Sequence, residues 1–136
     1  MSALVVPHPA QAVAITAVTE RLPAEYASAW VAGEIPNKRR PLMVRITRTP
    51  GGGVPHHGST DHANYIVECW AADEPAAERF SNYIGALWRS LPGQWAAGAF
   101  IRYSKCTAAY SWPDPDQSRH DQARWQFTAE LDIKVD

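Results

Sequence analysis

Residues 123–135, ARWQFTAELDIKV, decide the fold class, because apolar and polar residues alternate along the whole stretch. The apolar set is Trp125, Phe127, Ala129, Leu131, Ile133 and Val135, and the polar set is Arg124, Gln126, Thr128, Glu130, Asp132 and Lys134. Successive side chains of a β-strand point to opposite faces of its sheet. The stretch therefore predicts a long strand with one face in the core and the other in water.

Earlier stretches predict the strands that pair with this one. Residues 42–48 alternate between apolar and polar types, which predicts a strand with one buried face. Residues 62–71 carry apolar side chains on both faces, Trp70 among them, and predict a central strand or one that meets a partner. Residues 99–110 predict a further strand, and residues 27–31 a short one.

Two stretches predict helices. Residues 73–91 repeat apolar side chains at spacings of three and four, and Asp73 and Pro75 suit an N-cap and a first turn. Residues 9–22 begin with a proline, carry a rough apolar side and stop at Pro23.

Two polar stretches predict long loops between these elements. Residues 49–60 contain four glycines and two prolines, and residues 111–121 contain a Pro-Asp-Pro-Asp run. Together the elements predict an α+β fold, in which a mostly antiparallel sheet of four to five strands has two helices packed on one face. Because 136 residues is the usual length of one domain, we expect residues 1–136 to form a single domain.

Composition narrows the class of protein. A net charge of −1 gives little support for non-specific DNA binding, which depends on phosphate neutralisation by basic residues. Cys69 and Cys106 are too few for a disulfide framework and fit free thiols in a reducing cytosol. The chain shows no signal peptide and no run of about 20 apolar residues, so we expect a soluble protein without membrane contact.

Catalytic motifs are weak. His56, His57 and His62, with Asp61, form a group of potential metal ligands, but they lie in and just after a Gly/Pro loop. Metal sites need ligands that are held on rigid elements. Residues 51–53 are three glycines that lack the lysine and Ser/Thr of a phosphate-binding loop.

A group of acidic residues gives a second possible cation site. Its members are Asp114, Asp116 and Asp121, joined by Glu68 or Glu130. Acidic residues beside proline are ordinary in turns. We therefore expect no enzymatic activity, no metal and no cofactor.

Two features favour protein contacts. The one basic run is Lys38-Arg39-Arg40, with Arg45 and Arg48. It could be a solvated turn, or it could contact DNA or an acidic neighbouring subunit. If it has a partner, we favour a protein over DNA. Six tryptophans would crowd one small core, so we expect one or two of them at subunit contacts.

Several segments carry a family resemblance through their order and spacing. After an N-terminal helix they are Val44-Arg45-Ile46-Thr47-Arg48, Gly51-Gly52-Gly53, residues 66–77 (IVECWAADEPAA), residues 113–117 (PDPDQ) and residues 124–128 (RWQFT). In this pattern the chain resembles the tail terminator proteins of long-tailed phages, particularly those of actinobacterial hosts, over about residues 8–135. The histidine-bearing segment 54–62 is longer than the family pattern.

The resemblance implies a six-membered ring at the tail–neck junction of a virion, assembled in the host cytoplasm. Such a ring caps the tail tube, stops polymerisation of the tube protein and joins the tail to the head-side connector, and DNA passes through it without specific binding. Each subunit of a ring needs two different contact patches. The candidate contact residues are Arg45, Arg48, Gly52, His56, His57, Trp70, Trp112, Asp114, Arg119, Arg124 and Trp125.

Three alternatives stay open. The nearest is another neck component, a head-side stopper or adaptor, because all of these are small ring-forming proteins. The second is a small metal-dependent hydrolase that uses the histidine group, and the third is a monomeric binding module.

Overall fold

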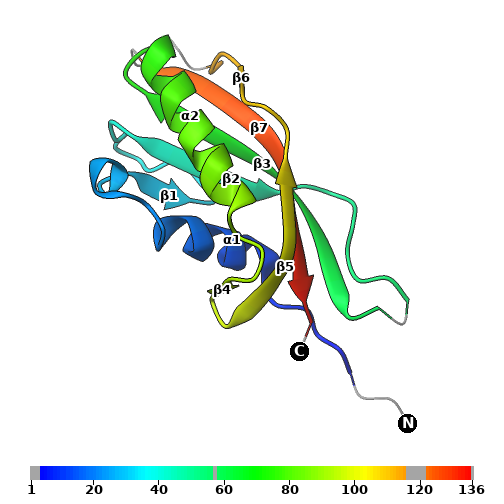
Figure 1. Ribbon diagram of the computed structural model, residues 1–136. Helices are drawn as coiled ribbons and strands as arrows, with labels where there is room; N and C mark the ends of the chain where they lie inside the picture. Colours follow the sequence, from blue (N-terminus) through cyan, green and yellow to red (C-terminus); the bar gives the residue numbers. More distant parts are fainter. Residues whose placement is uncertain (1–3, 57, 116–121, 136) are drawn as a thin grey trace.

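The computed structural model describes residues 4–56, 58–115 and 122–135, which form an α+β structure (Figure 1). In chain order the elements are α1 (Ala10–Thr19), a 3₁₀ turn (Ala24–Tyr26), β1 (Trp30–Ala32), β2 (Met43–Arg48), β3 (Thr60–Ala71), α2 (Glu74–Arg89), β4 (Trp95–Ala96), β5 (Ala99–Cys106), β6 (Tyr110–Ser111) and β7 (Ala123–Lys134). The predicted fold class is confirmed. None of the described helices is long and apolar enough to span a bilayer.

The sheet has more strands than the sequence predicts. It has seven strands: six follow the order β1-β2-β3-β7-β5-β4, and the seventh, β6, pairs with β7. β1 runs parallel to β2, whereas the other pairs are antiparallel. The sheet is therefore mixed, and the predicted number of four to five strands is too low. β4 and β6 have two residues each, which is too short to show an alternating pattern.

Strands β3 and β7 form the centre of the sheet. They pair without interruption from Thr60 opposite Lys134 to Ala71 opposite Ala123. Both helices cover one face of this sheet, as Figure 1 shows, with α2 lying along β3, β5 and β7 and α1 packing near β1, β2 and β4. The other face carries no helix, and we call it the helix-free face.

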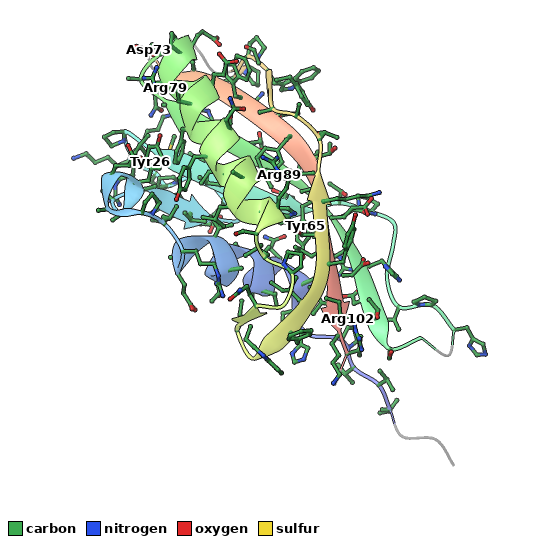
Figure 2. All side chains as sticks on the ribbon, in the orientation of Figure 1. Tyr26, Tyr65, Asp73, Arg79, Arg89 and Arg102 are labelled. Atoms are coloured by element: carbon green, nitrogen blue, oxygen red, sulfur yellow. The ribbon has the colours of Figure 1, made fainter. Side chains whose placement is uncertain are left out.

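The core lies between the helices and the sheet. Val13, Ala14, Ala17 and Val18 of α1 and Phe80, Ile84 and Trp88 of α2 are buried against alternate residues of the strands. Two buried polar side chains in this layer form hydrogen bonds to backbone carbonyls. Tyr65 donates from its hydroxyl to the carbonyl of Ala10 at 2.8 Å, between β3 and α1 (Figure 2). Trp88 donates from its indole to the carbonyl of Glu130 at 3.0 Å.

Helix α2 begins where the sequence predicts. The side chain of Asp73 accepts a hydrogen bond from the backbone N–H of Ala76 at 2.9 Å, and Pro75 lies in the first turn. Asp73 and Arg89 mark the two ends of the helix in Figure 2. An acidic first turn and a basic last turn both complement the helix dipole.

Two predicted strands have different bounds in the structure. The stretch 99–110 is divided, because β5 ends at Cys106 and the chain rejoins β7 only at Tyr110. The pairing of β5 with β7 also shifts by one residue between Ile101 and Tyr103. The short strand begins at Trp30 instead of Ala27, because a 3₁₀ turn occupies residues 24–26.

The predicted loop from Thr49 to Thr60 folds back on the sheet through Gly53, which exchanges backbone hydrogen bonds with His62 at 2.7 and 3.0 Å. Gly52 has a φ of +69°, and a Cβ there would collide with the carbonyl oxygen of His62. This glycine is therefore required by the close approach of two backbone segments.

Candidate interaction face

The pairing register places a set of polar side chains on the helix-free face. Because β3 sends Val67 and Cys69 toward the helices, Glu68 and Trp70 point the other way. Arg45 of β2 lies opposite Glu68, and Arg124 of β7 lies opposite Trp70. Three neighbouring strands thus bring these side chains into one cluster.

The indole ring of Trp70 is the centre of this cluster. It is 1% exposed, and three guanidinium carbons lie 5.4–5.8 Å from its ring centroid. They belong to Arg39, Arg45 and Arg124. Guanidinium groups are attracted to the negative face of an aromatic ring, more strongly when water is excluded. The ring therefore gathers cations that would repel one another in isolation.

Two buried carboxylates balance these cations. Glu68 accepts two hydrogen bonds of 2.8 Å from Arg45 and one of 2.7 Å from Arg124. Asp114 accepts from Arg39 at 3.0 Å and from the indole N–H of Trp70 at 2.9 Å. The hydrogen bond to Glu68 raises the pKa of the Arg45 guanidinium above its usual value, so this group keeps its charge.

The cluster also fixes the chain that follows β6. Arg124 donates to the carbonyls of Trp112 and Pro113 at 2.8 and 2.9 Å, and the backbone N–H of Trp112 donates to the carbonyl of Arg124 at 3.1 Å. The side chain of Trp112 stays 53% exposed and meets the ring of Tyr110 edge-on at 6.2 Å. An exposed aromatic pair is thus held on a backbone that buried charges fix in place.

Two hollows lie on this face, on either side of Ile66. One, of about 600 Å³, is lined by Gly33, Arg45, Thr47, Ile66, Glu68, Trp112 and Gln126. The other, also of about 600 Å³, is lined by Thr49, Asn64, Tyr65, Ile66, Lys105, Cys106, Thr107, Thr128, Ala129 and Glu130. Both hollows combine apolar surface with charged side chains, a composition that suits a protein contact.

Five of the predicted contact residues come together here, and they are Arg45, Trp70, Trp112, Asp114 and Arg124. They are distant in sequence and come from β2, β3, β7 and the chain after β6. Trp70 and Asp114 are buried inside the cluster, so their role is to support the face. Trp112 is the most exposed of the five, at 53%, and the side chain of Arg45 is partly exposed.

The other predicted residues lie elsewhere. Arg48 pairs with the buried carboxylate of Asp61, with atoms 3.0 and 3.3 Å apart, at the base of the glycine-rich loop. Trp125 faces the start of α2, where its indole donates to Glu74 at 2.6 Å. Gly52 and His56 lie in the loop itself. His57 and Arg119 lie outside the described residues.

The alternating pattern of residues 123–135 needs one correction. The sequence predicts Arg124 and Gln126 in water, but they are only 6% and 8% exposed. The reason is that Trp112 and Asp114 cover this end of the helix-free face. The predicted core residue Trp125 is half-buried instead.

Sequence reasoning missed the roles of Arg39 and Glu68. It placed Arg39 in an undivided basic run and considered Glu68 only as a possible cation ligand. The available signal was a lone carboxylate in the apolar strand around residues 66–71, because a buried charge needs a partner. The identity of that partner depends on the register of β2 and β7, which the sequence does not state.

The predicted histidine group is not assembled as a metal site in the described part of the chain. His62 pairs with Asp132 at 2.7 Å on β7, and the structure brings no three His, Cys, Asp or Glu residues together among those it describes. Cys69 is fully buried, and burial raises the pKa of its thiol above the usual value, so it stays protonated and unreactive at neutral pH.

Comparison with known proteins adds no family assignment, since no family model matches the chain and no curated protein matches it.

Proposed function

We propose that this chain is a structural virion protein, a tail terminator that forms a ring through contacts between subunits. The family resemblance of residues 8–135 suggests the role. The observation that carries it is the helix-free face, where Arg45, Glu68 and Arg124 hold the exposed Trp112 on a fixed backbone. Tryptophan, tyrosine and arginine are the residues that dominate protein interfaces.

The proposed ring is a hexamer with protein partners on both of its axial faces. One face would cap the tail tube and stop polymerisation of the tube protein, and the other would bind the head-side connector or stopper at the tail–neck junction. Genomic DNA would pass through the channel without specific binding, which a subunit with a net charge of −1 permits. Assembly would take place in the host cytoplasm.

The division of the sheet into two faces supports a contact role. The helices bury one face, whereas the other presents hollows beside Ile66 and the exposed rings of Tyr110 and Trp112. Rigid aromatic side chains make good contact residues because little conformational freedom is lost when a partner binds them. The hydrogen bonds from Arg124 to the carbonyls of Trp112 and Pro113 supply this rigidity before any partner arrives.

Electron microscopy of particles made when this gene is silenced in its parent phage tests the proposal. A tail terminator predicts overlong tail tubes that are not joined to DNA-filled heads. Tails of normal length that fail to join heads would contradict a terminator and indicate a head-side stopper or adaptor. Intact, infectious virions would overturn both structural roles.

A further inference from the structure

Large apolar side chains are exposed in two main regions of the described chain. One is the arm before α1, with Leu4, Val5 and Val6. The other is the margin of the sheet formed by β4, β5 and β6, with Trp95, Tyr103, Tyr110 and Trp112. Tyr83 of α2 is the remaining exposed large apolar residue among those described. Water contacts both regions, although each has the composition of a contact surface.

The arm lies outside the packed body of the domain. Leu4, Val5 and Val6 are 93%, 58% and 74% exposed, and Figure 1 shows the arm leading away from the sheet beside the C-terminal end of β7. Pro7 disfavours a helical conformation of the residue before it and so favours an extended arm. Valine is also enriched in strands. The arm therefore has the sequence of a short strand that its own chain leaves uncovered.

The margin of the sheet offers a place for such a strand. Ile101 exchanges backbone hydrogen bonds with Gly93 and Gln94 at 2.8 and 2.9 Å. Beyond it, no segment of the described chain pairs with residues 102–106 on the side away from β7. Figure 1 shows this part of β5 at the edge of the sheet, and Figure 2 shows Arg102 at its start.

Backbone groups on this edge are correctly directed to accept a strand. Thr107 donates its backbone N–H to Thr128 of β7 at 2.9 Å, so its backbone points into the sheet. Backbone groups of an antiparallel strand alternate in direction, so those of Cys106 and Ser104 point out of the sheet. An open edge of this kind readily pairs with a strand from another chain.

We propose that the arm of one copy, residues 4–6, binds the open edge of β5 in a second copy as an added strand. Tyr103, which is 51% exposed, would cover the arm from the helix-free side. Arg89, whose guanidinium lies 3.5 Å from the sulfur of Cys106, would cover it from the side of α2. One chain carries both halves of this contact.

The contact joins copies head to tail. The arm and the β5 edge are different patches of one subunit, and contacts between different patches generate a closed ring or an open filament. The inference goes beyond the proposed function, because any assembly of this chain can use such a contact. It is also independent of the tail tube and of the connector.

Cross-linking between variants that each have one accessible cysteine tests the contact. Each variant carries Cys106→Ser, and Cys69 is left in place because it is fully buried. A size-tagged Val5→Cys variant is mixed with Tyr103→Cys or, as the control, with Asn82→Cys on the exposed side of α2. A short bismaleimide reagent is added at several protein concentrations, and the tagged and untagged chains are resolved by mass.

Cross-linked heterodimers should form several-fold faster with Tyr103→Cys than with Asn82→Cys. Equal rates for the two partners would overturn the proposal. A second variant, Leu4→Lys and Val6→Lys added to Val5→Cys, tests the apolar contact without disturbing the fold, because these side chains are exposed. Its cross-linking to Tyr103→Cys should fall to the control rate, and an unchanged rate would also overturn the proposal. Neither outcome depends on the phenotype of the silenced phage, so this contact and the terminator role fail separately.

Discussion

At the scale of single residues, Glu68 joins three strands of the sheet. Its carboxylate is 7% exposed and accepts hydrogen bonds from Arg45 of β2 and Arg124 of β7. Removing one member of a buried ion pair leaves the other charge without compensation, which costs more than the pair contributes. The side chain of Arg124 is 7% exposed and cannot regain full hydration.

The variant Glu68→Gln keeps the shape of the side chain and removes its charge. We expect the free energy of unfolding to fall by about 3 kcal/mol, because Arg124 stays buried without its counter-charge. The matched control is Glu130→Gln, whose pair with Lys105 is exposed and spans 3.6 Å, and which should change stability by less than about 1 kcal/mol. Urea denaturation measures both. Equal effects would contradict a supporting role for Glu68.

The buried thiol of Cys69 should make the folded protein less stable at alkaline pH. Burial raises the pKa of its thiol in the folded state. Above the unfolded-state pKa of about 8.5, the thiol ionises more easily in the unfolded chain than in the folded one, so the free energy of unfolding falls as pH rises. The free energy of unfolding should fall by up to about 1.4 kcal/mol per pH unit above about pH 9. Cys69→Ala should show a smaller slope between pH 8 and about 10, measured by urea denaturation. Parallel curves for the two proteins would contradict this prediction.

At the scale of elements, the cap of α2 and the buried cluster have different origins. The cap is local, because Asp73 bonds a residue three positions later in the chain. The cluster is not local, because Arg39 and Asp114 meet across 75 positions. Local sequence therefore predicts the start of the helix, whereas sheet pairing decides the contacts of the charged residues.

The variant Asp73→Ala tests the cap. Loss of the hydrogen bond to the backbone N–H of Ala76 should lower the free energy of unfolding by about 1 kcal/mol. Asp73→Asn is the control, because asparagine caps a helix about as well and should cost only a few tenths of that amount. Thermal unfolding followed by circular dichroism distinguishes them, and an Asp73→Asn protein as unstable as Asp73→Ala would contradict a capping role.

At the scale of the whole molecule, stability and assembly should depend on different residues. The helix-covered face holds the core, whereas the helix-free face exposes Trp112 on a backbone that Arg124 holds. Exposed side chains contribute little to folding, but they contribute strongly to binding when a partner buries them.

The variant Trp112→Ser should separate the two properties. We expect the free energy of unfolding to change by less than about 0.5 kcal/mol, because the indole is exposed. Under the proposed terminator role, complementation of the silenced phage with this variant should fail to restore normal tails. Asn82→Ser is the control, since Asn82 is exposed on α2, away from the helix-free face. Equal complementation by the two variants would contradict the helix-free face as a contact surface.

The sequence by itself determined the helix from Asp73 onward, the long C-terminal strand and the α+β class, because these depend on local periodicity and capping. The tertiary structure alone decided that Arg39, Glu68 and Asp114 meet around Trp70. It also decided the parallel pairing of β1 and the burial of Arg124 on the face that alternation assigns to water. The physical reason is strand register. The alternation of apolar and polar residues predicts which face of the sheet a side chain occupies, but only the pairing of distant strands determines which side chains become its neighbours.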